Sequence, residues 1–424
     1  MKIVICGMGY VGVTMAACLL KQGHRVVGID VNAAKTETIA AGRSPIHEPG
    51  VGELLLAGHR EGRLVGDIDL QPHLADADMV LLCVGTPSAA NGALDLSQVR
   101  QVTGEIGAAM ASRTGDAGQL LIVYRSTMLP GSMDKVVMPA LIEAIGEAPG
   151  TRYEVAYNPE FLRESTAVRD YFDPPKIVIG ERAKGQSQRL MGLYDGIEAP
   201  TFEVPFASAE MLKYVDNSFH ALKVAFANEV GRLALETGID AQEVMEIFLA
   251  DTKLNISPYY LRPGGAFGGS CLPKDVRALS ACMRDHGVHA PIVDNLMATN
   301  NAHKEYVAKR VLNALPSTKR VLMLGLTFKS DTDDLRESHL VDLAERLLGA
   351  GCELKIFDPD LKTDELIGQN LRFVEEHLPH LSRLLVTEPL GTAEASDLVV
   401  LGKAMPAVMD SLPRGSRVIN LHRL

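Results

Sequence analysis

Short runs of β-branched and apolar residues recur along the first half of the chain, each followed by glycine or a polar segment. We predict buried strands at residues 2–6 (KIVIC), 25–30 (RVVGID), 79–85 (MVLLCVG), 120–126 (LLIVYRS), 153–158 (YEVAYN) and 176–180 (KIVIG). Residues 10–21 are apolar on every side and predict a buried helix. Alternation of this kind is typical of a parallel sheet whose two faces are covered by helices.

The pattern changes near residue 207. Residues 207–237 contain no Pro and one Gly, and apolar residues recur at helical spacing: Met211, Leu212, Val215, Phe219, Leu222, Val224 and Phe226. This predicts one helix of roughly 30 residues, near 45 Å at about 1.5 Å per residue. Such a helix is too long for one small domain, so it either bridges two domains or packs against a partner chain. A second helix is expected at about 241–250, before a loop-rich stretch at 251–275.

Alternation resumes at residue 320. Strands are predicted at 320–326, 353–358, 397–402 and 417–421, with a helix near 335–350. The last third of the chain is therefore predicted to be a second doubly wound α/β domain.

Composition and charge narrow the classes of function. The chain has 424 residues, 46% of them apolar and 22% charged, which is typical of a globular protein of two to three domains. Its net charge of −11 argues against a nucleic-acid or anionic-membrane partner, although one basic pocket still permits a phosphorylated substrate. No apolar run is long enough to span a membrane, and MKIVICG breaks into glycines too soon for a signal peptide.

The six cysteines are scattered. No two have the spacing of a zinc site or a redox dithiol, so no metal is expected. Free thiols, most of them in apolar runs such as LLCVG, are consistent with a reducing cytoplasm.

A glycine motif predicts a dinucleotide site. Gly7, Gly9 and Gly12 follow the first strand and open the first helix, where they permit a tight turn, close approach to a pyrophosphate and close helix–strand packing. Asp30 ends the second strand, where a carboxylate accepts hydrogen bonds from ribose hydroxyls and repels a 2′-phosphate. We therefore expect NAD rather than NADP; the alternative is glycines kept for packing alone.

Two threonines follow other strands. Thr86, in VGTP, is a candidate cofactor contact or part of an ordinary turn, and Thr127 is a candidate contact to a catalytic water or the cofactor, or a cap hydroxyl.

Carboxylates cluster in residues 158–165 (NPEFLRES). If this stretch is helical, Glu160 and Glu164 share a face one turn apart, which favours a general base; the alternative is a solvated, charged helix start. On the long helix, Lys213, Asn217 and His220 share a face, where Lys and Asn together suit an oxyanion. The alternative is a Lys that extends to solvent and a surface Asn.

Residues 262–275 (RPGGAFGGSCLPKD) hold a cysteine in a polar setting. Cys271 follows Gly-Gly-Ser and precedes Lys274 and Asp275, and a nearby cation lowers the pKa of a thiol and raises its reactivity. The ordinary alternative, a buried inert cysteine, fits this context poorly.

Together these segments resemble the UDP-glucose/GDP-mannose dehydrogenase family nearly end to end. The resemblance rests on GMGYVG (7–12), SPIHEPG (44–50), VGTPS (84–88), NPEFLRES (158–165), AEMLKY (209–214), FGGSCLPKD (267–275) and GLTFKSDTDDLRES (325–338). It implies an α/β fold of two Rossmann-like doubly wound domains joined by a long central helix and a helical dimerisation region. The implied domains are 1–200 for NAD binding, 201–300 for dimerisation and 301–424 for the nucleotide sugar, in a homodimer or a higher homo-oligomer.

The resemblance also implies roles. Cys271 would be the nucleophile, Lys213 and Asn217 would stabilise the oxyanion, Asp275 would support the thiol and a water, and Glu164 would be the base, assisted by Thr127 and Glu160. The implied cofactor set is Gly7, Gly9, Tyr10, Val11, Gly12, Asp30, Lys35, Thr86 and Lys329. The implied substrate set is Phe161, Leu162, Glu164, Lys213, Asn217, Phe267, Gly268 and Arg336, with Tyr259, Tyr260 and Arg262 acting across the dimer interface.

The GDP-mannose branch is the more similar one, through SPIHEPG, NGALDL (91–96), LRESTA (162–167) and CLPKDVRAL (271–279). UDP-glucose enzymes more often have Gly where Ser165 stands and Phe where Leu272 stands, whereas Gly265 departs from the bulkier residue of the GDP-mannose branch. The expected reaction is a four-electron, NAD-dependent oxidation of a nucleotide-sugar C6 alcohol to a carboxylate, with a UDP-hexose as the alternative substrate. A two-electron hydroxyacid dehydrogenase and a non-catalytic NAD-sensing protein are more distant alternatives.

Overall fold

The computed structural model describes residues 1–87, 94–113, 118–183, 185, 188–257, 264–269, 272–315, 318–327, 334–361, 366, 368–395 and 398–421. The chain divides into two compact units, Met1–His220 and Ala221–Leu424. Each unit is built around its own sheet.

The first unit contains an eight-stranded sheet of order β3-β2-β1-β4-β5-β6-β7-β8. Its strands are β1 (Lys2–Cys6), β2 (Arg25–Ile29), β3 (Leu64–Asp67), β4 (Met79–Leu82), β5 (Leu120–Tyr124), β6 (Tyr153–Tyr157), β7 (Ile177–Glu181) and β8 (Thr201–Pro205). The six predicted strands are all present. The two strands at the sheet edges, β3 and β8, were not predicted.

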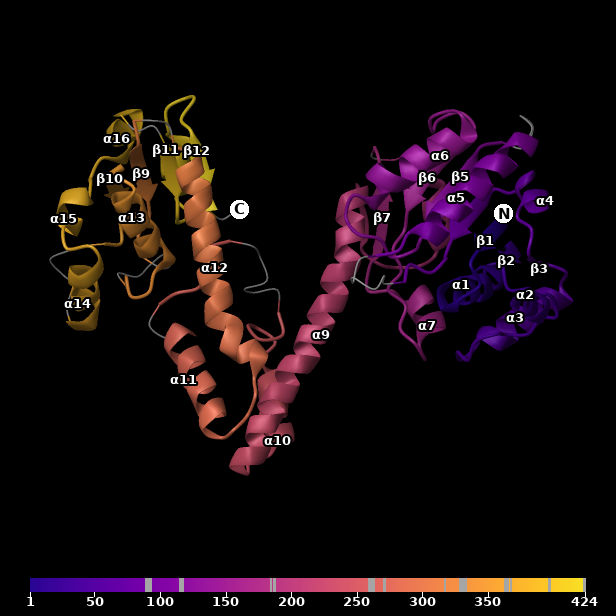
Figure 1. Cartoon of the computed structure of the whole chain (residues 1–424), viewed down its shortest axis with the longest axis horizontal. Coiled ribbons are helices and arrows are strands. Elements are labelled where there is room, and N and C mark those ends of the chain that lie inside the picture. The colour runs from indigo at the N-terminus through magenta and orange to yellow at the C-terminus, as the bar shows by residue number, and fades with distance from the viewer. Residues whose placement is uncertain are drawn as a thin grey trace. The chain divides into compact units, whose positions relative to one another are not determined.

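Helices cover both faces of this sheet (Figure 1). Along β1, Ile3 and Ile5 join one core cluster and Val4 and Cys6 join the other, as the twofold periodicity of a strand requires. Helices α1 (Tyr10–Lys21) and α3 (Val51–Arg60) pack on the first face, and α5 (Ser97–Ala109) and α6 (Met138–Ile145) pack on the second. Shorter helices α2 (Ala33–Ala40), α4 (Gln71–Leu74), α7 (Ala167–Phe172) and α8 (Gln188–Met191) complete the unit.

One strand departs from the predicted parallel arrangement. Strand β7 pairs antiparallel with β6, with Tyr157 opposite Gly180, whereas the other neighbouring pairs of this sheet are parallel. Residues 158–176, which connect β6 to β7, therefore begin and end at the edge where the carboxyl ends of β1, β4, β5 and β6 lie. The segment NPEFLRES thus stays at the edge where ligands of doubly wound sheets bind.

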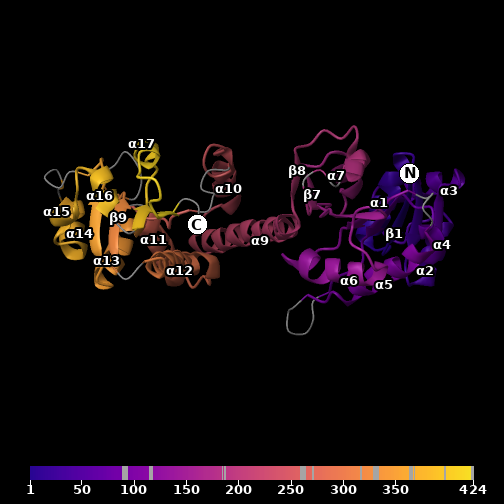
Figure 2. The same cartoon turned by 90° about the horizontal axis from the view of Figure 1, so that it is seen from above.

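The predicted long helix is present. Helix α9 (Phe206–Thr237) is continuous (Figure 2), and the boundary between the two units falls within it. Helix α10 (Ala241–Ala250) has the predicted bounds, whereas α11 (Leu272–Asp285) begins inside the stretch predicted to be loop. Helix α12 (Pro291–Asn313) follows. Among the described residues, no helix combines the length and the apolar character that a bilayer span requires.

The second unit contains a parallel four-stranded sheet of order β10-β9-β11-β12. Its strands are β9 (Arg320–Leu324), β10 (Glu353–Phe357), β11 (Leu398–Leu401) and β12 (Val418–Asn420). Helix α13 (His339–Gly349) covers one face, and α14 (Gly368–His377), α15 (Leu381–Leu384), α16 (Pro389–Ala395) and α17 (Pro406–Asp410) complete the unit. The prediction of a second doubly wound domain is confirmed.

A buried cation joins the carboxyl ends of three strands in this unit. Lys403 Nζ donates to Asp358 at 2.8 Å, to Asp360 at 2.6 Å and to the Thr327 hydroxyl at 2.7 Å. The other oxygen of Asp358 accepts the backbone N–H groups of Leu326 and Thr327. A carboxylate after the second strand of this unit is thus fully engaged within the protein.

Candidate active site

The glycine motif is built for close approach. Gly7 has a φ of +95°, and an added Cβ there would lie 2.8 Å from the Val84 nitrogen; at Gly12 it would lie 1.9 Å from the Gly7 carbonyl oxygen. Both positions therefore require glycine for the fold itself. At Gly9, by contrast, an added Cβ meets no described atom within 4 Å, so packing against the described residues does not require this glycine.

Helix α1 begins beside this glycine. Gly9 is its N-cap, with no side-chain hydrogen bond to the first turn and no acidic residue in that turn. Exposed N–H groups at a helix start attract phosphate. Tyr10 and Val11 form the first turn, as the predicted pyrophosphate site requires.

Asp30 faces the same loop. Its Oδ2 accepts the Met8 N–H at 2.9 Å and the Lys35 ammonium at 3.3 Å, and its Oδ1 accepts the Asn32 N–H at 3.0 Å. A carboxylate accepts about four hydrogen bonds, so one position on Oδ1 is available for a ribose hydroxyl. This geometry fits the adenosine half of NAD, whose nicotinamide supplies a hydride acceptor when bound.

Two further strand ends meet at this edge. The Thr86 hydroxyl donates to the Thr127 carbonyl oxygen at 2.8 Å, and the Ser126 hydroxyl donates to the Val84 carbonyl oxygen at 2.7 Å. The loops after β4 and β5 are thereby fixed to one another, which brings the two predicted threonines together.

The segment after β6 is not helical, so Glu160 and Glu164 do not share a helix face as the conditional prediction required. Proline at position 159 and the short connection to α7 keep residues 158–166 in extended and turn conformations. Glu160 instead pairs with Lys213 at 2.8 Å, where their side chains are 13% and 10% exposed. The structure therefore shows a mostly buried ion pair between a carboxylate and an ammonium group, and not two neighbouring carboxylates on one helix face.

Phe161 lies between two ammonium groups. Lys213 Nζ lies 5.7 Å from the ring centroid and Lys176 Nζ lies 4.8 Å from it, within cation–π range. Lys176 also pairs with Asp216 at 2.6 Å. Lys176 and Asp216 were missed by sequence reasoning, because isolated charged residues carry no pattern.

The three residues predicted to share one face of α9 differ in burial. Lys213 is buried in the first unit, whereas Asn217 and His220 are exposed. The structure therefore brings Lys213 to Glu160 but gives Asn217 no described polar contact.

Glu164 is exposed on a turn whose neighbours are tightly held. Ser165 has a φ of +71°, a left-handed conformation that favours glycine. Glu48 accepts the Ser165 and Ala167 N–H groups at 2.8 and 2.9 Å and the Tyr10 hydroxyl at 2.6 Å. Glu48 lies in SPIHEPG, a motif quoted for the resemblance, but no role was predicted for it.

The predicted residues of the second unit lie around residues 264–269. The backbone of Phe267 exchanges hydrogen bonds with the Asn300 side chain, and the Gly269 N–H donates to the Arg336 carbonyl oxygen. A Cβ at Gly268 would lie 2.4 Å from the Glu337 carbonyl oxygen. The Arg336 guanidinium binds both oxygens of Asp334, while Asp275 is exposed beside Lys274.

Gly265 has a local explanation. A Cβ there would lie 2.4 Å from Nε2 of His339, so the His339 ring fills the space that a larger residue would take. The predicted residues Cys271, Tyr259, Tyr260, Arg262 and Lys329 lie outside the described residues.

Four of the described cysteines are poor nucleophiles, because burial raises the pKa of their thiols. Burial raises the pKa of Cys18 and of Cys83 to about 12, and it raises the pKa of Cys6 and Cys352 as well. At neutral pH these four thiols are therefore protonated.

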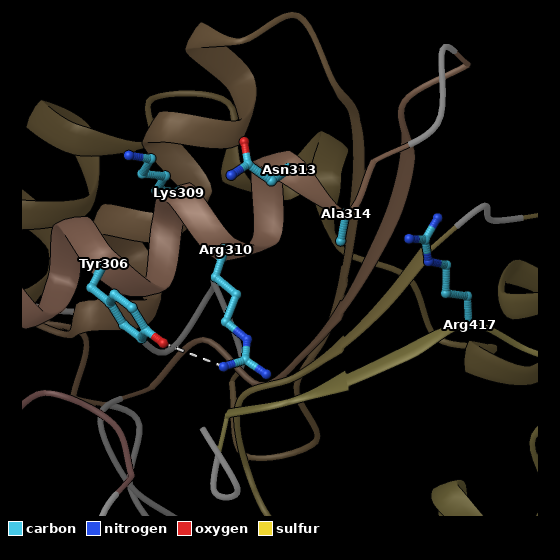
Figure 3. Close-up of a pocket in the computed structure, with 6 residues that line it drawn as sticks. All are labelled: Tyr306, Lys309, Arg310, Asn313, Ala314 and Arg417. Atoms are coloured by element: carbon cyan, nitrogen blue, oxygen red, sulfur yellow. Dashed lines mark hydrogen bonds between the residues drawn. The ribbon is translucent and has the colours of Figure 1, made fainter. Parts of the chain in front are cut away.

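A basic hollow of about 480 Å³ lies elsewhere in the second unit, lined by Tyr306, Lys309, Arg310, Asn313, Ala314 and Arg417 (Figure 3). The Arg310 guanidinium donates to the Tyr306 hydroxyl at 3.4 Å. Arg417 precedes β12 and Asn313 ends α12, so the hollow lies where strands begin rather than where they end. Lys309 and Arg310 complement the carbonyl end of α12, which accounts for the charge without a ligand.

Comparison with known proteins covers the chain in three consecutive regions. The NAD-binding domain of the UDP-glucose/GDP-mannose dehydrogenase family matches residues 1–198, its central domain matches 207–302 and its UDP-binding domain matches 322–410. GDP-mannose 6-dehydrogenase of Azotobacter vinelandii is 44% identical over 424 residues, which cover 99% of this chain and 96% of that protein. A UDP-glucose 6-dehydrogenase of Haloferax volcanii is 35% identical and covers 85% of this chain and 83% of its own length.

Solved structures agree with these matches. A ternary complex of GDP-mannose dehydrogenase from Pseudomonas aeruginosa superposes with a TM-score of 0.94 at 43% identity, covering 99% of this chain and 96% of that one. A UDP-glucose dehydrogenase from Pyrobaculum islandicum gives a TM-score of 0.56 at 33% identity, covering 99% and 94%. The glycine motif, the strand-end carboxylate and these similarities confirm the predicted NAD-dependent oxidoreductase, and the chain belongs to the UDP-glucose/GDP-mannose dehydrogenase family.

Proposed function

We propose that this protein oxidises the C6 alcohol of GDP-mannose to the carboxylate with two equivalents of NAD. The observation that carries the choice of sugar is similarity: the chain is 44% identical to a GDP-mannose 6-dehydrogenase over 99% of its length, against 35% over 85% for a UDP-glucose enzyme. The pair Lys213–Glu160, at the same sheet edge as the glycine motif, supplies the polar centre that such an oxidation needs.

The reaction has two oxidation stages. The C6 hydroxyl loses a proton and a hydride to give an aldehyde, and the thiolate of Cys271 adds to the aldehyde carbon to give a thiohemiacetal. Loss of a second hydride leaves a thioester, and water attacks its carbonyl carbon to release the carboxylate and the free thiol. When bound, NAD would supply the hydride acceptor for both stages.

Lys213 is the proposed electrostatic partner of the sugar C6 oxygen. This oxygen develops negative charge at each stage, and a preorganised ammonium stabilises that charge most where water is excluded. The Lys213 side chain is only 10% exposed, and its ammonium lies 2.8 Å from a Glu160 oxygen. This burial and this ion pair hold the ammonium in place before substrate binds. Asn217, one helical turn further along α9, is the proposed second donor.

Cys271 is the proposed nucleophile because its sequence setting suits a reactive thiol, and four of the other five cysteines are poor candidates. Four of the described cysteines have a pKa raised by burial, whereas Cys271 follows glycines and precedes Lys274 and Asp275. Asp275 and Glu164, both exposed carboxylates, are the proposed partners of the hydrolytic water.

Two positions that separate the branches have explanations other than the sugar. Ser165 adopts a φ of +71°, so a glycine in related enzymes would relieve backbone strain at that turn. At Gly265, the His339 ring occupies the space that a larger side chain would need. Gly265 therefore does not argue against GDP-mannose, and Ser165 does not by itself argue for it.

We also propose three functional domains, at 1–200, 201–300 and 301–424, and a homodimer formed through the central helices. Helix α10 has no buried residue, although it carries Val244, Ile247 and Leu249. On α9, Met211, Val215, Leu222 and Val224 are each about half exposed or more. Apolar helix faces of this extent are typical of an interface between chains.

The test is the number of NADH molecules formed per sugar, with limiting GDP-mannose or UDP-glucose and excess NAD. Two NADH per GDP-mannose supports the proposal, whereas two per UDP-glucose and none per GDP-mannose would reassign the substrate. The variant Cys271→Ser should keep NAD binding but lose carboxylate, and full turnover by that variant would refute covalent catalysis.

The same experiment separates the more distant alternatives. A two-electron dehydrogenase would give one NADH per substrate and would survive thiol alkylation. A non-catalytic NAD-binding protein would bind NAD and give no NADH with either sugar.

A further inference from the structure

Glu48 is a buried carboxylate without a cationic partner. The residue is 6% exposed and takes part in no ion pair among the described side chains. Its charge is instead met by three donors, the Tyr10 hydroxyl at 2.6 Å and the N–H groups of Ser165 and Ala167 at 2.8 and 2.9 Å. Burial raises the pKa of Glu48, but these hydrogen bonds outweigh it and hold the pKa below its usual value.

The three donors come from two functional loops. Tyr10 is the first residue of α1, directly after the N-cap Gly9 of the cofactor motif. Ser165 directly follows Glu164, the proposed hydrolytic base. The Tyr10 hydroxyl also lies 3.4 Å from the Arg163 carbonyl oxygen, so the cofactor loop and residues 163–167 meet at Glu48.

The turn around Glu164 depends on this anchoring. Ser165 is held at a φ of +71°, which non-glycine residues adopt only when their surroundings enforce it. On the other side of the turn, Asp170 accepts the Arg163 N–H and its guanidinium at 3.0 Å. Asp170 thus fixes the start of the turn, and Glu48 fixes its end.

We propose that Glu48 is a positioning residue that joins the NAD-binding loop to the turn carrying Glu164, so that cofactor affinity and thioester hydrolysis depend on one carboxylate. This inference rests on the proposed function for its hydrolytic half. Its cofactor half rests on the NAD-binding domain alone.

The geometry predicts a coupled defect. In Glu48→Gln, an NH2 group replaces one acceptor oxygen and faces a donor, so either the Ala167 N–H or both the Tyr10 hydroxyl and the Ser165 N–H lose their acceptor. In either case the link between Tyr10 and residues 165–167 is broken. A misplacement of about 1 Å at a reacting group costs on the order of a hundredfold in rate. We expect NAD to bind about three- to tenfold more weakly and hydrolysis to slow by tenfold or more.

The experiment compares Glu48→Gln, Tyr10→Phe and the control Glu53→Gln in the full-length protein. Glu53 is an exposed glutamate in the first turn of α3, so its variant makes the same change of charge without touching Tyr10 or Ser165. NAD affinity is measured by calorimetry without substrate. Hydrolysis is followed after rapid mixing with GDP-mannose and NAD, by intact-protein mass spectrometry of the thioester on Cys271.

The informative variant is Tyr10→Phe, which keeps Glu48 and the backbone contacts of Ser165. If the thioester accumulates in Tyr10→Phe as well as in Glu48→Gln, and not in Glu53→Gln, a change in the cofactor loop has reached the hydrolytic turn. If Tyr10→Phe weakens NAD binding but hydrolyses the thioester at the wild-type rate, the coupling is refuted.

The outcomes also separate this inference from the proposed function. A wild-type protein that forms no NADH with either sugar refutes the proposed function, yet calorimetry still tests the link between Glu48 and NAD. A wild-type protein that turns over normally, with Glu48→Gln equal to Glu53→Gln in both measurements, refutes this inference alone. Thermal unfolding of each variant identifies any that fail to fold, and Tyr10→Phe then decides the question.

Discussion

At the scale of single residues, contacts within the protein occupy only part of the Asp30 carboxylate, and we propose that NAD takes the rest. It accepts the N–H groups of Met8 and Asn32, which fix the loop around it, and the acceptor position that remains is the one we propose for the ribose. A hydrogen bond to a charged group contributes about 1.5–3 kcal/mol, so Asp30→Asn should weaken NAD binding by roughly 10- to 150-fold. Calorimetric titration with NAD measures this.

The matched control for Asp30 is Asp195→Asn, which removes an exposed carboxylate of the same unit. Its NAD affinity should equal that of the wild type. Equal affinity in Asp30→Asn would show that this carboxylate does not contact the cofactor.

The contacts of Asp170 predict that the free energy of unfolding depends on pH. Hydrogen bonds from Arg163 and Thr166 hold the pKa of Asp170 below its usual value although burial opposes them. Since the pKa is lowered in the folded state, the stabilisation is complete above the unfolded pKa of about 3.9 and is lost as the pH falls through the folded pKa. Asp170→Asn should therefore be less stable than the wild type at pH 6, and the difference should shrink below about pH 4.

Urea midpoints between about pH 2.5 and 6 test this dependence, since the midpoint follows stability. Asp173→Asn is the control, because Asp173 is an exposed carboxylate just after α7. A constant difference between Asp170→Asn and the wild type at every pH would contradict the assignment.

Residues that belong to a local sequence pattern were predictable, whereas residues that act through contacts between distant segments were not. Gly7, Gly12 and Asp30 were identifiable because a strand, a turn and a helix fix their spacing. The Glu48 contact with Ser165 joins positions 117 residues apart, and no local pattern encodes it. The shared helix face of Glu160 and Glu164, predicted only if this stretch is helical, does not arise, because residues 158–166 are not helical and Glu160 pairs with Lys213 instead.

At the scale of elements, two glycines of the turn from β1 into α1 are expected to differ in role, one in folding and the other in NAD binding. Gly12→Ala places a Cβ 1.9 Å from the Gly7 carbonyl oxygen, so α1 must shift, and overpacking of this kind costs about 1–3 kcal/mol or more. Gly9 has φ −84° and ψ −163°, which any residue adopts, and its Cβ would meet no described atom. Gly9→Ala should therefore fold like the wild type and lose NAD affinity by tenfold or more, on the order of 1.4 kcal/mol.

Thermal unfolding without NAD, followed by titration with NAD, distinguishes the two glycine variants. A lowered unfolding temperature in Gly12→Ala alone and weakened NAD binding in Gly9→Ala is the expected pattern. Wild-type NAD affinity in Gly9→Ala would show that the pyrophosphate does not lie against this residue.

Element prediction failed at the edges of the first sheet. Strands β3 and β8 are largely solvent-exposed on at least one face, and they include Val65, which is 42% exposed, and Phe202, which is 49% exposed. Edge strands need no continuous apolar run, so the signal that identified the central strands was absent. The reversed direction of β7 was also not predictable, because a buried run such as KIVIG carries no information on direction.

At the scale of the whole molecule, the exposed apolar faces of α9 and α10 predict an assembly. Val224 is 63% exposed and Ile247 is 70% exposed in the single chain. The double variant Val224→Glu/Ile247→Glu should shift the protein from a dimer toward a monomer, because it places charges in a desolvated interface. Sedimentation velocity measures the change.

Ile68→Glu is the matched control for assembly, because Ile68 is 59% exposed and directly follows β3, at an edge of the first sheet, and is not part of α9 or α10. It should leave the sedimentation coefficient unchanged. A wild-type protein that sediments as a monomer at every concentration would refute the proposed dimer.

The antiparallel pairing of β6 and β7 has a consequence for how such an enzyme can change. Because residues 158–176 leave and re-enter the sheet at one edge, they form a replaceable unit that requires no new crossover of the sheet. Their internal contacts, such as Arg163 with Asp170, travel with them in any exchange. Doubling the length of such a loop costs only about 0.6 kcal/mol in closure entropy. Evolution or an engineer can therefore reshape this wall of the site by exchanging one continuous stretch, provided that Glu160, Glu164 and the anchor on Glu48 are kept.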